Sequence, residues 1–134
     1  MERSAKAART GRYGIVCTGV KRGGPSQKLP IKPGRYVGVV FVRVPAAIKG
    51  KPTIQIALIP RNAKNQDLPA SFTTTIHPRS KNWRPITVVA DVPAKVQDQE
   101  VAKARFMILL EEFQPGEQVH IDDAMLYRLD DRQN

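Results

Sequence analysis

The chain has 134 residues, the length of one domain, so an enzyme built from two domains around a central cleft is excluded. It carries 22 lysines and arginines against 12 aspartates and glutamates, a formal net charge of +10. The single cysteine, Cys17, excludes an internal disulfide and a cysteine-rich zinc site. The longest apolar runs, such as residues 37–42, are too short to span a bilayer, so no membrane partner is expected.

Positive charge is concentrated at the start of the chain. Residues 1–51 contain twelve basic side chains and one acidic one, whereas residues 52–134 contain ten basic and eleven acidic ones. We expect residues 1–12 to form a basic, flexible arm. One alternative function is therefore polyanion or nucleic-acid binding through the basic positions Arg3, Lys6, Arg9, Arg12, Lys21, Arg22, Lys28 and Lys32. Nucleic acid is the less favoured partner, because no aromatic side chains alternate with these residues to stack on bases.

The rest of the chain has the pattern of short β-strands. Eleven prolines and nine glycines separate runs rich in Val, Ile, Thr and Phe, and no long window keeps a helical period. Strands are expected at residues 14–20, 35–44, 53–59, 71–77, 86–92, 104–112 and 118–129, with a loop at 94–103. This pattern predicts an all-β fold, a two-layered β-sandwich over residues 13–130, followed by a polar tail at 131–134.

Alternation along these strands separates a core side from an outer side. On the core side we expect the large side chains Tyr36, Val40, Ile56, Phe106 and Ile108. The residues between them are predicted to form one mixed sheet face made of Phe41, Arg43, Gln55, Arg105, Met107 and Glu111. Two alternatives stay open for this set: Phe41 as a packing residue, and Glu111 as the ion-pair partner of an arginine.

Catalytic motifs are missing from the sequence. There is neither a Gly-any-Ser-any-Gly elbow nor a phosphate-binding loop. Glu111 and Glu112 are consecutive in a strand, so their carboxylates point to opposite faces and cannot straddle a glycosidic bond. His77 and His120 are far apart and lack neighbouring metal ligands, and Cys17 lies in a strand that is expected to be buried. We therefore expect a protein without enzyme activity.

The order of several short segments resembles a known family. Residues 10–15, Thr-Gly-Arg-Tyr-Gly-Ile, are followed by residues 27–36, Gln-Lys-Leu-Pro-Ile-Lys-Pro-Gly-Arg-Tyr. Trp83 opens a later strand, and residues 119–126 read Val-His-Ile-Asp-Asp-Ala-Met-Leu. In this order they resemble the galactose-binding-like jelly-roll carbohydrate-binding modules, which are non-catalytic accessory domains of glycoside hydrolases. The resemblance implies a polysaccharide or oligosaccharide ligand, a catalytic domain in the parent chain, and an extracellular or periplasmic location.

The family's structural calcium site has an incomplete counterpart here. In the family, a first strand of the type Asn-any-Gly-Phe-Glu supplies ligands, and a last-strand aspartate that matches Asp122 completes the site. Only Asp122 can be carried over, and one carboxylate is too few for an ion that takes six to eight oxygens. The absence of that first strand implies that the natural domain starts upstream of Met1.

The sequence thus predicts a carbohydrate-binding accessory module that holds glycan on one sheet face. Arg43 and Arg105 would favour acidic or hydroxyl-dense glycans, because the guanidinium fork binds carboxylate and sulfate groups bidentately. The remaining alternative is a structural spacer that binds nothing and packs against a catalytic neighbour.

Overall fold

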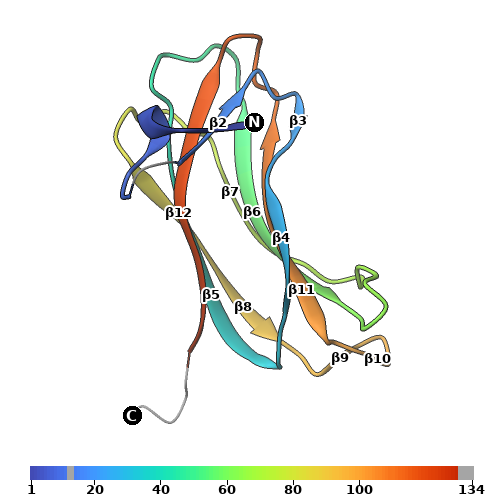
Figure 1. Ribbon diagram of the computed structural model, residues 1–134. Helices are drawn as coiled ribbons and strands as arrows, with labels where there is room; N and C mark the ends of the chain where they lie inside the picture. The colour runs from blue at the N-terminus through green and yellow to red at the C-terminus, as the bar shows by residue number, and fades with distance from the viewer. Residues whose placement is uncertain (12–13, 130–134) are drawn as a thin grey trace.

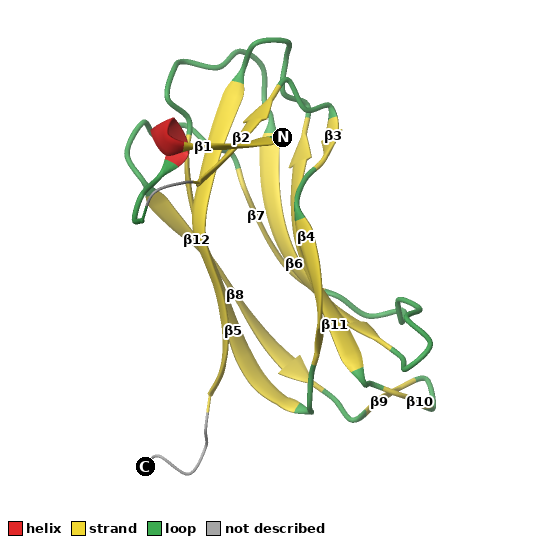
Figure 2. Ribbon diagram, viewed as in Figure 1, coloured by secondary structure: helices red, strands yellow, loops and turns green. Residues whose placement is uncertain are grey.

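The computed structural model describes residues 1–11 and 14–129. Arg12 of the predicted basic arm and the predicted polar tail at 131–134 lie outside these residues. Within these residues the chain forms two layers of antiparallel strands, with one short 3₁₀ turn, η1 (Ala5–Ala7), near its start (Figure 1, Figure 2). No helix in the described residues is long and apolar enough to cross a membrane.

The first layer, sheet A, has its strands in the order β1-β2-β12-β5-β8. The bounds are β1 Glu2–Ser4, β2 Gly14–Thr18, β12 Gln118–Leu129, β5 Gly34–Arg43 and β8 Arg84–Val92. The second layer, sheet B, has β11 paired with β6 on one side and with both β3 and β4 on the other, and β7 beyond β6. Its bounds are β3 Arg22–Gly23, β4 Ser26–Pro30, β11 Lys103–Glu111, β6 Thr53–Arg61 and β7 Phe72–Ile76.

The all-β sandwich predicted from the sequence is confirmed, and each expected strand is present within two residues at either end. The strands that sequence patterns missed are short or carry few apolar side chains. The segment 94–103, expected to be a loop, contains a small hairpin of β9 (Lys95–Val96) and β10 (Gln99–Glu100). Strand β4 has one apolar side chain, Leu29, besides its terminal proline, and such a strand is tolerated because it lies at a sheet edge.

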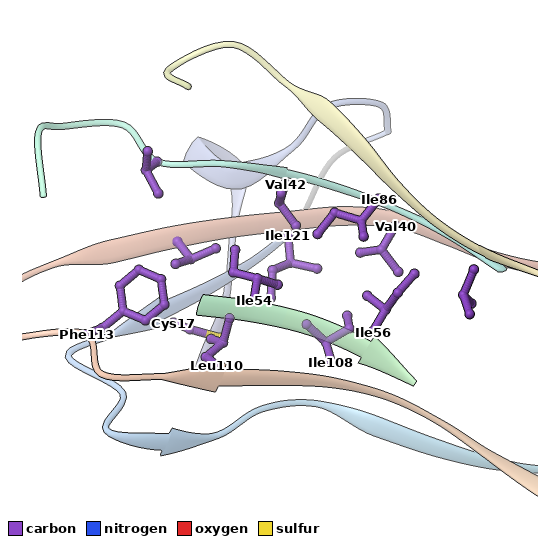
Figure 3. Packing of buried hydrophobic residues seen from close by; sticks show 13 residues of the cluster. Cys17, Val40, Val42, Ile54, Ile56, Ile86, Ile108, Leu110, Phe113 and Ile121 are labelled. Atoms are coloured by element: carbon purple, nitrogen blue, oxygen red, sulfur yellow. The ribbon is translucent and has the colours of Figure 1, made fainter. Parts of the chain in front are cut away.

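The core fills the space between the two layers. Its larger cluster joins Val40 of sheet A to Ile56 and Ile108 of sheet B, and Figure 3 shows these side chains meeting from both sides. Tyr36 belongs to a second cluster, and Phe106 is half-buried against both clusters. The predicted core positions are therefore correct, with Phe106 more exposed than expected.

The prediction of a single mixed face is wrong. Phe41 and Arg43 lie on β5 in sheet A, whereas Gln55 and Arg105 lie on strands of sheet B. The loop at 44–52 carries the chain from one layer to the other, so the outer residues of β5 and β6 point away from each other across the sandwich. Alternation shows which residues share one side of a strand, but it does not show which sheet the strand joins.

The basic N-terminal segment also differs from the expected free arm. Strand β1 extends sheet A by pairing with β2, with Arg3 opposite Ile15. The turn η1 follows, and Ala7 is completely buried. Residues 2–10 are therefore part of the sandwich and contact sheet A.

Candidate functional site

Four of the six predicted site residues share the outer face of sheet B. The antiparallel register sets Gln55 opposite Leu109, Met107 opposite Ala57, and Glu111 next to Thr53. Residues paired in this way point to the same side of a sheet. The side chains of Gln55, Arg105, Met107, Leu109 and Glu111 are all half-buried, so each keeps some surface open to solvent.

On this face, polar groups lie beside the aliphatic side chains of Met107 and Leu109. Gln55 donates a hydrogen bond from Nε2 to Oγ1 of Thr75 at 3.1 Å, which leaves the Gln55 carbonyl oxygen pointing away from that bond. At one end, the Arg22 guanidinium lies 3.4 Å from a Glu111 carboxylate oxygen. Glu111 is thus an ion-pair partner, as one sequence alternative held, but its partner is Arg22.

Arg105 takes part in a cluster that the sequence did not indicate. Its Nη2 contacts one carboxylate oxygen of Asp67, and Nε of Arg61 lies 3.1 Å from the other. Arg61 is 93% buried, and its Nη2 also donates to the carbonyl of Asn65. One carboxylate therefore compensates two guanidinium groups, one of which is shielded from water.

Phe41 and Arg43 are occupied by contacts within the protein. The Arg9 guanidinium stacks on the Phe41 ring, 3.5 Å from its centroid. Arg43 donates from Nε to Nδ1 of His120 at 3.1 Å and from Nη2 to the carbonyl of Lys6 at 2.8 Å. Phe41 and Arg43 thus hold the N-terminal segment against sheet A, and they lie far from the face of Gln55 and Arg105.

The protonation of His120 is shaped by its burial next to Arg43. Burial lowers the pKa of the imidazole below its usual value, and the positive charge of Arg43 lowers it further. The neutral imidazole is the form that can accept the hydrogen bond from Arg43, so the lowered pKa and the observed contact agree. The Trp83 ring centroid lies 4.8 Å from Cζ of Arg43, so Trp83 packs against this guanidinium.

Asp122 and its neighbour anchor the N-terminal segment. Oδ2 of Asp122 accepts hydrogen bonds from the backbone N–H groups of Arg9 at 2.7 Å and Thr10 at 3.1 Å. Oδ1 of Asp122 accepts the N–H of Asp123 at 2.8 Å. The Asp123 carboxylate in turn accepts from the Thr10 hydroxyl and from the Arg9 guanidinium, and these two bonds, the hydroxyl first, lower the pKa of Asp123.

These contacts do not fit a calcium site at Asp122. Both oxygens of that carboxylate already accept N–H groups, and a cationic side chain, Arg9, lies on the adjacent carboxylate. In the described part of the chain, no three His, Cys, Asp or Glu side chains come together as metal ligands. Asp122 of the last strand thus binds backbone amide donors, and the neighbouring Asp123 binds the guanidinium of Arg9.

Gly14 provides a test of this attachment. A Cβ at this position would overlap the carbonyl oxygen of Ala7 and come within 3.0 Å of the Ile121 carbonyl oxygen. We expect Gly14→Ala to push η1 off sheet A and to lower the free energy of unfolding by about 2 kcal/mol, the scale of overpacking in a fixed site. Urea denaturation measures this loss.

Deletion of residues 1–8 supplies the matched control for Gly14→Ala. In the truncated chain the alanine no longer meets Ala7, so the substitution should cost much less there than in the full chain. Equal costs in both backgrounds would show that η1 does not press on Gly14.

A cleft of about 420 Å³ opens between the edges of the two sheets. It arises because β2 pairs with β12 only as far as Ile121, so the edges of the sheets separate beyond that point. Phe106 and Ile108 are among its apolar lining residues, and Asp122 and Asp123 are among its polar ones. Since the two aspartates already bind residues 9 and 10, the polar part of this cleft serves the N-terminal attachment.

Sheet A exposes an apolar patch on β8 and on the C-terminal part of β12. The patch is made of Val89, Met125, Tyr127 and Leu129. Val89 is 58% exposed and Tyr127 48%. Tyr127, Val37 and Val89 stand side by side on β12, β5 and β8, which places them on one continuous surface. This apolar patch lies on the outer face opposite to the one that carries Gln55.

The cysteine does not have the setting of a nucleophile. Cys17 is 1% exposed and belongs to the core cluster. Burial raises the pKa of its thiol, which disfavours the reactive thiolate.

No protein-family model matches the chain, and no curated protein matches it either. Among solved structures, the fold is similar to one described as Family 16 Carbohydrate Binding Module-2, at 18% sequence identity and a TM-score of 0.66, covering 94% of this chain and 84% of that chain. It is similar to TmCBM61 in complex with beta-1,4-galactotriose, at 13% identity and a TM-score of 0.65, covering 93% and 77%. It is also similar to a cyclase from Fischerella sp. TAU, at 15% identity and a TM-score of 0.60, covering 92% and 68%.

These likenesses establish the fold. The chain has the β-sandwich jelly roll of carbohydrate-binding modules, as the sequence resemblance implied. Because an enzyme shares this fold, the fold by itself does not decide whether the chain has catalytic activity.

Proposed function

We propose that the protein is a non-catalytic carbohydrate-binding module that holds a glycan on the outer face of sheet B. The observation that carries this proposal is the gathering of Gln55, Arg105, Met107 and Glu111 on one open surface built from adjacent strands. The solved carbohydrate-binding modules with the same fold support it as well.

The chemistry of this face suits a polysaccharide chain. Met107 and Leu109 offer aliphatic surface to the C–H side of a sugar ring, and Gln55 offers an amide oxygen to its hydroxyls. No aromatic side chain lies on this face among the described strand residues, so no strong stacking contact is available. Weak binding that is spread over several sugar units follows from such a surface.

The setting belongs to the same proposal. We place the module outside the cell or in the periplasm, beside a catalytic domain in the parent chain. The basic N-terminal residues are poorly suited to the polyanion alternative, because Arg9 is paired with Asp123 and residues 2–4 are part of sheet A.

A spacer role is the second candidate function, and the apolar patch of Val89, Met125, Tyr127 and Leu129 favours it. A monomeric domain rarely leaves such residues together on one face without a partner. In this candidate function a neighbouring domain of the parent chain covers the patch and the chain binds no glycan.

Affinity electrophoresis against neutral and acidic polysaccharides tests the glycan proposal. At least one polysaccharide should retard the protein, and the double substitution Gln55→Ala with Met107→Ala should weaken the apparent affinity roughly tenfold, the effect of losing one hydrogen bond and one apolar contact. The control is Thr87→Ala, an exposed site on sheet A, which should leave migration unchanged. Retardation by no polysaccharide at all would leave the spacer role as the better account.

A further inference from the structure

A basic hollow lies at one end of the sandwich, where loops connect the two sheets. The loop at 44–52 joins β5 to β6, and the loop at 77–83 joins β7 to β8. They enclose two adjoining cavities of about 250 and 200 Å³, which share His77 and Arg79 in their walls. We call this the loop-end hollow, and the cationic side chains that line it are Lys51, Arg79, Lys81, Arg84 and Arg43.

No acidic side chain lines the loop-end hollow, and Glu117, which lies outside its lining, uses its carboxylate to accept the backbone N–H of Lys49. No acidic residue occurs at 43–52 or 77–84. Lys51, Arg79, Lys81 and Arg84 are exposed and form no ion pair within the described residues. Arg22, Arg61 and Arg105, by contrast, each have a carboxylate partner. Repulsion among neighbouring cations in the hollow is relieved when an anion binds there.

The backbone around the loop-end hollow is fixed. The Val44 N–H donates to the Ser80 carbonyl at 2.9 Å and so ties one loop to the other. Pro52 and Pro78 are buried at the bases of the loops, and the Ser80 hydroxyl accepts the N–H of Asn82 at 3.0 Å. The two loops that carry the cationic side chains are therefore tied to each other, which lowers the backbone entropy lost when a ligand binds.

We infer that the loop-end hollow binds a sulfate or carboxylate group of an acidic polysaccharide. Lys51, Arg79 and Lys81 meet the anionic group, while Val44 and Ile48 provide apolar walls for the carbons of the sugar ring. The hollow lies at the end of the sandwich where β6 begins at Thr53, two residues before Gln55, and where β7 ends at Ile76. The inference thus rests on the proposed glycan-binding function and specifies the charge class of the glycan.

A sugar acid suits the loop-end hollow better than a nucleic acid does. Single-stranded nucleic acids bind by stacking their bases on aromatic side chains. Apart from the imidazole of His77, no aromatic side chain lines either cavity.

The test compares two variants that lose the same charge at different places. The probes are dextran sulfate, unsulfated dextran and single-stranded polyuridylate. The hollow variant carries Lys51→Gln, Arg79→Gln and Lys81→Gln. The matched control carries Lys32→Gln, Lys64→Gln and Lys95→Gln, three exposed lysines outside the loop-end hollow, so both variants lose the same charge. All six side chains are exposed, and urea denaturation confirms that both variants fold.

We expect the hollow variant to bind dextran sulfate at least tenfold more weakly than the control variant, with the difference shrinking in high salt. Equal weakening in both variants would mean a general charge attraction and would overturn the inference, as would tighter binding of polyuridylate than of dextran sulfate. Binding of a neutral polysaccharide depends on Gln55 and Met107 and should be the same in the two variants. If the unaltered protein binds dextran sulfate but no neutral polysaccharide, the result counts against the proposed function. If the hollow variant and the control variant bind dextran sulfate equally well, the result counts against the loop-end hollow.

Discussion

Replacing Phe113 by alanine is expected to lower the free energy of unfolding by about 4 kcal/mol. Phe113 is 1% exposed and packs in the larger core cluster, which Figure 3 shows between the two layers. Its backbone N–H donates to the Val20 carbonyl at 3.0 Å, which holds the residue in place after β11 ends. The ring thus closes one end of the core, and its removal leaves a cavity that strands on both sides cannot fill. Urea denaturation followed by Trp83 fluorescence measures the effect.

The control for Phe113 is Val89→Ala. Val89 is 58% exposed on the outer face of sheet A, so its truncation should change the free energy of unfolding by about 0.5 kcal/mol or less. If Phe113→Ala cost as little as Val89→Ala, the ring would not be a core residue.

Asp67→Asn is expected to lower the free energy of unfolding by about 3 kcal/mol, because it leaves the buried Arg61 guanidinium without a counter-charge. The amide keeps the size of the carboxylate, so the loss reports charge and not packing. Arg105 loses the same partner, and its side chain is freed on the face of sheet B. Thermal or urea unfolding measures the loss.

The same substitution in an exposed ion pair provides the matched control. Arg35 and Asp91 are bonded at 2.8 Å, but both side chains are more than half exposed and screened by water, so Asp91→Asn should cost much less than Asp67→Asn. Equal costs at Asp67 and Asp91 would show that the burial of Arg61 contributes nothing.

The N-terminal segment occupies the region where the resembled modules hold their structural calcium. Its backbone N–H groups bind Asp122, the position at which the sequence resemblance places a calcium ligand, and its Arg9 side chain binds the neighbouring Asp123. The segment therefore joins the first residues of the chain to the last strand through hydrogen bonds and an ion pair. It also covers Phe41 and Arg43, which removes them from the candidate binding surface.

The binding proposals divide the molecule into two regions with different chemistry. Gln55 and Met107 lie on the open face of sheet B, where neutral contacts dominate. Lys51, Arg79 and Lys81 surround the loop-end hollow, where charge dominates. Salt therefore separates them, since screening weakens the second interaction and leaves the first nearly unchanged.

The sequence alone determined the fold class, most of the strands and the side of each strand that faces the core. Alternation at Val40, Ile56 and Ile108 is a local property, and it persists whichever strands become neighbours. Turn residues such as Pro33 and Gly34 likewise mark strand ends through local backbone preferences.

Only the tertiary structure decided which of these sides form one surface. Phe41 and Gln55 were separated by a loop that crosses between layers, and Asp67 reached Arg61 and Arg105 through chain folding that no local pattern records. The anchoring of Arg9 by Asp123 joins residues 114 positions apart. Pairing between distant strands depends on the free energy of the whole packed sandwich, so residues that share a face are found only once the sheets are assembled.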